Sequence, residues 1–156
     1  MDIKQLYQDI ILEHGKSPRN LGKCDGYNHD AKGYNPLCGD KVHVYLKLNE
    51  EKRVEDLTFE GEGCAISLAS ASIMTELVKG KSFGETEEIK DFFLSMVKDT
   101  KEVDLKHLDE DEKTKLMSLS GVKKFPMRVK CATLSWHTLF SAIEKKKKEI
   151  NAEEID

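Results

Sequence analysis

Apolar residues recur along this chain with two different periods, and the change from one to the other predicts the order of its elements. Strict alternation of apolar and polar residues over 41–48 predicts a strand that is buried on one side. A polar turn at 49–52 leads to a second strand-like segment at 54–60, so we expect a hairpin in an antiparallel sheet. A shorter strand is expected near 27–31, within a loop rich in glycine, proline and asparagine.

Helical spacing of apolar residues covers much of the remaining chain. Asp2 is placed to cap the first helix, which we expect to end between Gly15 and Pro18. Ser82 and Glu85 have the spacing of a capping box at the start of another helix. The other expected helices span residues 64–79 and the stretch from about Arg128 or Cys131 through Ile143, with a lysine-rich tail at 145–148.

Residues 98–115 interrupt this pattern, because 12 of these 18 residues are charged. Only Val103, Leu105 and Leu108 can serve as apolar anchors there, so we expect a solvated surface segment with two short helical pieces before Gly121. With 156 residues and 38% hydrophobic content, the chain is long enough for one ordinary core and too short for two. We therefore expect a single domain over residues 1–156.

Composition and charge argue against several classes of function. A charged fraction of 35%, a net charge of −4 and no apolar run near the ~20 residues of a membrane-spanning helix argue against a membrane protein. The mildly acidic balance, without a basic stripe interleaved with aromatic residues, argues against nucleic-acid binding. The amino terminus does not have the layout of a secretion signal, so we expect a cytoplasmic location.

The four cysteines, at positions 24, 38, 64 and 131, carry the candidate chemistry. A disulfide framework is not expected in a reducing compartment, which leaves thiolate chemistry or inert burial. Gly39 lets the chain fold back between Cys38 and Asp40, so that both side chains can face one point. Cys64 follows a Gly-Glu-Gly turn at the expected start of a helix, where unpaired N–H groups stabilise a thiolate.

Cys131 is expected at another junction of loop and helix, with Arg128 and Lys130 adding positive charge nearby. Three thiolates and one carboxylate would satisfy tetrahedral zinc, and the two cations would offset the negative charge of such a site. However, cysteines spaced this widely are commonly small buried hydrophobic residues, and Asp40 can simply close its own turn. The residues alone leave these alternatives open, and Cys24 is expected to be a surface or packing thiol.

Three segments around these cysteines have a distinctive sequence. They are Tyr34-Asn35-Pro36-Leu37-Cys38-Gly39-Asp40, Gly61-Glu62-Gly63-Cys64-Ala65-Ile66-Ser67 and Arg128-Val129-Lys130-Cys131-Ala132-Thr133-Leu134-Ser135-Trp136. They resemble the three cysteine segments of the NifU amino-terminal, IscU and SufU proteins, and the likeness covers nearly the whole chain. It favours the SufU branch, because Lys130 stands where IscU-type proteins carry a histidine and a helical insertion occupies about residues 81–124.

The resemblance implies an α+β fold with a three-stranded antiparallel sheet, helices packed on one face and a metal site at one end. It implies that Cys38, Asp40, Cys64 and Cys131 bind zinc, that Cys38 is the sulfur acceptor, and that Arg128 lies beside the site. The implied function is iron–sulfur cluster assembly, as a zinc-dependent acceptor and carrier of persulfide sulfur. The implied partners are a cysteine desulfurase of the SufS type and downstream cluster assembly components.

Two alternatives to sulfur transfer remain open at the level of the sequence. One is a scaffold on which a transient 2Fe-2S cluster is built, as in IscU-like proteins. The other is a binding module whose zinc is purely structural. The sequence likewise leaves open whether the chain is an enzyme, namely a zinc-dependent sulfurtransferase that works with the desulfurase.

Overall fold

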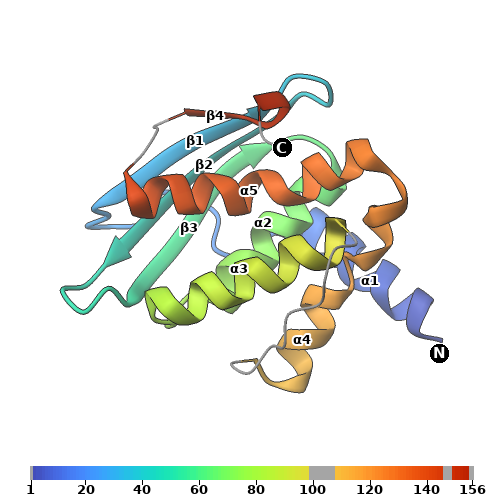
Figure 1. The fold of residues 1–156 in the computed structure, drawn as a ribbon, viewed down its shortest axis with the longest axis horizontal. Helices are drawn as coiled ribbons and strands as arrows, with labels where there is room; N and C mark the ends of the chain where they lie inside the picture. The colour runs from blue at the N-terminus through green and yellow to red at the C-terminus, as the bar shows by residue number, and fades with distance from the viewer. Residues whose placement is uncertain (1, 99–107, 146–148, 155–156) are drawn as a thin grey trace.

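The structure is a computed structural model that describes residues 2–98, 108–145 and 149–154, and in these residues the centre is a four-stranded sheet (Figure 1). The strands are β1 (His29–Asn35), β2 (Asp40–Leu48), β3 (Val54–Glu62) and β4 (Glu149–Asn151). They lie in the order β3-β2-β1-β4. The antiparallel pairing of β2 with β3 confirms the hairpin expected from the alternating residues.

The expectation of a three-stranded antiparallel sheet was wrong, because β4 adds a fourth strand that runs parallel to β1. This edge strand has three residues, of which only Ile150 is a large apolar residue, so it carries no alternation that predicts it. β1 also differs from the expected 27–31 segment, since it starts at His29 and continues to Asn35. Its extension matters because it ends next to Cys38.

The helices pack on one face of the sheet, as expected (Figure 1). Helices α2 and α5 contact the strands directly, α3 packs against α5, and α1 and α4 lie further out against α2. Both predicted caps are present: Asp2 accepts from the Gln5 N–H at 2.8 Å, and Ser82 and Glu85 exchange reciprocal hydrogen bonds. The bounds are α1 (Ile3–Lys16), α2 (Ala65–Val78), α3 (Phe83–Lys98), α4 (Glu110–Met117) and α5 (Pro126–Glu144), with 3-10 helices η1 (Ser120–Lys124) and η2 (Ala152–Glu154).

A fully buried tryptophan fixes α5 against its neighbours. Trp136 stacks on Phe93 of α3 with ring centroids 4.8 Å apart, and its Nε1 donates to Ser70 Oγ of α2 at 3.1 Å. The small side chains of α2 allow this close approach, and a buried aromatic pair contributes about 0.5–1.5 kcal/mol beyond its area. Because α2 and α5 carry two of the predicted ligand segments, this contact sets their relative position.

The last helix begins earlier than the sequence predicted. Pro126 occupies its first turn. Proline has no backbone N–H to donate, but an N–H in the first turn has no partner within the helix in any case. Cys131 is therefore the sixth residue of α5 and lies inside the helix. The expectation that Cys131 sits at a junction of loop and helix was wrong, because the helix already begins at Pro126.

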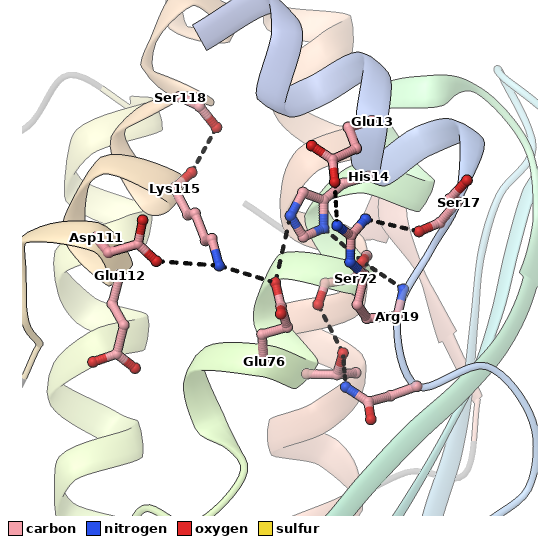
Figure 2. A network of polar contacts seen from close by, with 12 residues as sticks. Glu13, His14, Ser17, Arg19, Ser72, Glu76, Asp111, Glu112, Lys115 and Ser118 are labelled. Atoms are coloured by element: carbon pink, nitrogen blue, oxygen red, sulfur yellow. Dashed lines mark hydrogen bonds and ion pairs between the residues drawn. The ribbon is translucent and has the colours of Figure 1, made fainter. Parts of the chain in front are cut away.

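A polar cluster joins α1 to α2 and α4 (Figure 2). His14 is buried, with Nδ1 2.7 Å from Ser72 Oγ and Nε2 3.4 Å from Glu76 Oε1. Lys115 Nζ of α4 lies 3.5 Å from the same Glu76 oxygen, so one carboxylate connects three helices. Burial lowers the pKa of His14, and the charge of Arg19 acts in the same direction, which favours the neutral imidazole.

The described part of the charged segment agrees with a surface location. Leu108 is partly buried against the core, and α4 and η1 supply two short helical pieces before and around Gly121. Val103, Leu105 and Lys146 to Lys148 lie outside the described residues. Among the residues that are described, no helix has the length and apolar character needed to cross a membrane.

Candidate metal centre

The hairpin that joins β1 to β2 brings two predicted site residues to one end of the sheet. Asn35 pairs with Asp40 across the hairpin, and residues 36–39 make the connection between them. Cys38 N–H donates to the Asn35 carbonyl oxygen at 3.3 Å, and Gly39 has a φ of +71°, which a residue with a side chain rarely adopts. Cys38 is thus half-buried in the loop, whereas Asp40 is the first residue of β2.

Asp40 is buried beside the start of α2. Its Oδ1 accepts a hydrogen bond from the backbone N–H of Cys64 at 2.9 Å, and its side chain is 1% exposed. Gly63 makes this approach possible, because its φ is +143° and a Cβ atom at that position would collide with Asp40 Oδ1. The carboxylate therefore joins the β1–β2 hairpin to the α2 segment.

Cys131 approaches the same point from α5. Its Sγ lies 3.3 Å from Cys38 Sγ, and the thiol is 1% exposed. Ligand atoms of Cys38, Asp40 and Cys131 all lie within 4.8 Å of one another, a spacing that can hold one metal ion. The structure thus brings together three of the four side chains that the sequence singled out as ligands.

Cys64 lies at the margin of this group. Its Sγ is 4.0 Å from Asp40 Oδ2, and it occupies the N-cap position of α2. The pKa of Cys64 is lowered to about 6, mainly because the Cys131 thiol donates a hydrogen bond to the thiolate, with further help from the N–H groups of Ser67 and Ile66. In the same pair, the pKa of the donor Cys131 is raised by that hydrogen bond and by burial.

The two basic residues near Cys131 occupy different surroundings. Arg128 is exposed, and its pKa is raised by the negative charges of Cys64 and Cys131, so its guanidinium acts on the thiol group. Lys130 lines a cavity of about 300 Å³ together with Val97, Thr133 and His137. Arg128 is therefore placed to interact with the charge of the thiols, whereas Lys130 lines the neighbouring cavity.

The donor set fits zinc. Three thiols and one carboxylate are ligands that zinc takes up in tetrahedral sites, with bonds of about 2.0–2.3 Å, so ligand atoms lie about 3.5–3.8 Å apart. The observed separations of 3.3 Å between Cys38 and Cys131 and 4.0 Å between Cys64 and Asp40 bracket that range. Cys64 lies outside the group of three ligand atoms that are within 4.8 Å of one another, so its side chain would have to move closer to complete a tetrahedral site.

Sequence reasoning missed one residue beside the thiols. Asn35 is 1% exposed, and its Nδ2 lies 3.7 Å from Cys131 Sγ. Its position at the end of β1 was not predicted, because the expected strand stopped at residue 31. Cys24, in contrast, is a buried free thiol and does not belong to this group, which agrees with packing, one of the two roles expected for it.

Taken together, the chain is a small α+β protein that presents thiols and one carboxylate at the end of a β-hairpin. The NifU-like N terminal domain family matches residues 6–132. The chain belongs to this family. Among similar proteins, the "Zinc-dependent sulfurtransferase SufU" of Bacillus subtilis is 41% identical over 92% of this chain and 93% of its own length. The "Iron-sulfur cluster assembly scaffold protein IscU" of Streptococcus pyogenes is 40% identical over 92% of this chain and 86% of its own length.

Solved structures share the fold. A crystal structure from Fervidobacterium islandicum AW-1, described as a candidate iron–sulfur cluster assembly scaffold protein for the SUF system, matches with a TM-score of 0.77 and 32% identity. The match covers 89% of this chain and 97% of that one. The amino-terminal part of a NifU-like protein from Brucella abortus also gives a TM-score of 0.77, and at 24% identity it supports the fold alone.

Proposed function

We propose that this protein acts in iron–sulfur cluster assembly as a zinc-dependent acceptor of persulfide sulfur from a cysteine desulfurase. The observation that carries the proposal is the unequal exposure of two neighbouring thiols. Cys38 is half-buried in a hairpin loop, whereas Cys131, 3.3 Å away, is buried within α5. An incoming persulfide can reach the loop thiol much more easily than the helical one, so one sulfur can exchange while the other stays in place.

The proposed transfer is a thiol–persulfide exchange. The Cys38 thiolate attacks the terminal sulfur of the persulfide on the desulfurase, a new sulfur–sulfur bond forms on Cys38, and the cysteine of the desulfurase leaves as a thiolate. When bound, zinc would supply the Lewis acidity that keeps its cysteine ligands deprotonated at neutral pH. No electron donor is required, because the sulfur moves at constant oxidation state.

The remaining site residues have distinct proposed roles. Cys64, Cys131 and Asp40 would hold the zinc while Cys38 leaves it. Arg128 is exposed next to the thiols and would offset their negative charge, and it can also attract the anionic persulfide. We propose that Lys130 adds positive charge at a longer distance.

The proposal is tested by measuring sulfur acceptance with a purified desulfurase and cysteine. Cys38→Ala should abolish the mass gain of one sulfur atom on this protein, and Cys24→Ala is the matched control because Cys24 is buried away from the site. Metal analysis of both variants shows whether the site is still loaded. Continued sulfur loading of Cys38→Ala would contradict the assignment, and no loading of the wild-type chain would contradict the proposed function.

A scaffold role is the second candidate, and the name of the Streptococcus pyogenes relative favours it. Under that alternative, anaerobic reconstitution with iron and sulfide would give a coloured 2Fe-2S protein. If the protein is a sulfur acceptor instead, we expect it to contain zinc and to show no visible absorption. A chain that binds zinc but neither accepts sulfur nor builds a cluster would be a binding module with a structural zinc.

The proposal extends to organisation and location. We propose that residues 1–156 form one domain with a helical insertion at about 81–124, since α3, α4 and η1 lie between the second and third cysteine segments. A cytoplasmic location suits the chemistry, because exchangeable thiolates need a reducing environment and all four cysteines are free. If sulfur acceptance is shown, the protein is best classed as a sulfurtransferase.

A further inference from the structure

Asn35 is the last residue of β1, and it contacts both the fixed and the exchangeable side of the site. Its side chain is 1% exposed, with Nδ2 3.7 Å from Cys131 Sγ and Oδ1 3.3 Å from the Leu37 backbone nitrogen. Its carbonyl oxygen accepts from the Cys38 N–H at 3.3 Å. A single residue therefore connects the buried sulfur on α5 to the loop that carries Cys38.

The surroundings fix the orientation of the amide. The Leu37 N–H can only donate, so the side-chain oxygen of Asn35 has to face it. The NH₂ group must then point toward Cys131 Sγ, where it can only donate. The sulfur must accept this hydrogen bond, which it can do both as a thiol that donates its own proton to Cys64 and as a metal-bound thiolate, and the bond is stronger to the charged sulfur.

We propose that Asn35 is a positioning residue that holds Cys131 as the permanent ligand of the metal centre and keeps the Cys38 loop folded beside it. The inference deepens the proposed function and rests on it for the identity of the metal. The amide supplies an N–H···S bond to Cys131, whereas Cys38 is tied to Asn35 only through its backbone. This difference explains why one of two adjacent thiols can leave the metal and the other stays.

The test compares Asn35→Asp and Asn35→Ala with Asn28→Asp. Aspartate has the shape of asparagine and keeps the oxygen that faces Leu37, but it loses the donor to sulfur. Asn28 is the matched control, because its amide also bridges two groups, donating to the Leu48 carbonyl at 2.8 Å and accepting from the Leu48 N–H at 2.9 Å. Asn28 lies at the opposite end of the β1–β2 hairpin from the thiols.

The primary readout is zinc affinity, measured by competition with a chelator in the absence of any desulfurase. Both Asn35 variants should bind zinc at least about tenfold more weakly than the wild type, the usual effect of losing a group that orients a metal ligand. In the cobalt-substituted protein, the sulfur-to-cobalt charge-transfer bands should move to lower energy, because a sulfur that loses its N–H donor gives up electron density more readily. Asn28→Asp should leave both quantities unchanged.

If both Asn35 variants bind zinc as tightly as the wild type and show the same charge-transfer band position, the inference is overturned. Asn35 would then only anchor the loop. If the variants do not unfold cooperatively, the wild-type protein decides the matter by NMR. Its Asn35 side-chain amide protons should move downfield and exchange more slowly when cadmium is added, and an unchanged amide would overturn the inference. The proposed function fails separately, because sulfur acceptance by the wild-type chain is measured without reference to Asn35.

Discussion

Asp40 accepts a hydrogen bond from the backbone N–H of Cys64 at 2.9 Å, although 24 residues separate them in the chain. Through this contact a strand residue accepts a hydrogen bond from a backbone N–H at the start of a helix. The contact also places the second cysteine segment beside the first. The same carboxylate belongs to the group of candidate metal ligands. Asp40 therefore has a structural task that is independent of any metal.

The structural task of Asp40 predicts different effects for two substitutions. Asp40→Ala should lower the free energy of unfolding of the metal-free protein by about 1–2 kcal/mol, because the N–H of Cys64 loses its partner. Asp40→Asn keeps an oxygen acceptor and should lose less. Urea unfolding in the presence of a chelator measures both, and equal losses would show that the hydrogen bond to Cys64 is not what stabilises this corner.

Gly63 should tolerate no side chain. Its φ of +143° and the collision of a Cβ atom with Asp40 predict that Gly63→Ala destabilises the metal-free protein by at least ~2 kcal/mol and weakens zinc binding. Gly84→Ala is the control, because nothing lies within 4 Å of a Cβ atom there and alanine favours the helix. Similar stability of the two variants would contradict the close approach of Gly63 to Asp40.

Acidic pH should destabilise the fold through two histidines, of which His14 is buried and His137 is half-buried. Burial, aided by the charges of Lys98 and Lys90, lowers the pKa of His137 from 6.5 to about 4, and burial also lowers the pKa of His14. Well above pH 6.5 the imidazole is neutral in both the folded and the unfolded chain, so it does not affect stability there. As pH falls from 6.5 toward 4, the unfolded chain binds a proton that the folded chain does not, which costs up to about 3 kcal/mol for His137.

The pH effect is measured by urea unfolding of wild type and His137→Gln across this range. The variant should lose less stability than the wild type on acidification, since glutamine does not titrate. Its remaining pH dependence reports His14 and the carboxylates. Parallel curves for the two proteins would show that His137 is protonated equally in the folded and unfolded states.

Zinc removal should lower the melting temperature markedly. Three chain segments meet at the site, so a metal bound only by the folded state stabilises it, by about 4 kcal/mol when free zinc exceeds its dissociation constant a thousandfold. Circular dichroism melting with and without a chelator measures the change, and restoring zinc should reverse it. Identical melting curves would mean that these side chains do not hold a stabilising ion.

Elements with long, regular patterns could be predicted from the sequence, and those without could not. Alternation over 41–48 and the capping residues Asp2 and Ser82 correspond to observed structure because each reflects a local physical requirement. β4 is too short for a pattern, and its pairing with β1 is a long-range event. The last helix was expected from about Arg128 or Cys131, although Pro126 is well suited to a first helical turn, which is where the structure has it.

The sequence could single out candidate ligands, but it could not show which of them lie together or how exposed each one is. The sequence singled out Cys38, Asp40, Cys64 and Cys131, and three of them have ligand atoms within 4.8 Å of one another. It could not show that Cys131 is buried inside α5 while Cys38 remains accessible. Nor could it indicate that Asn35 reaches Cys131, because that contact depends on how β1 and α5 pack.

X-ray absorption at the zinc edge of the natively purified protein shows whether the three thiols and Asp40 hold a zinc ion. We predict one zinc ion per chain, with three sulfur neighbours at about 2.3 Å and one oxygen neighbour at about 2.0–2.2 Å. Cys38→Ala should lose one of the three sulfur neighbours. A native protein without zinc, or a zinc ion with fewer than three sulfur neighbours, would contradict this prediction.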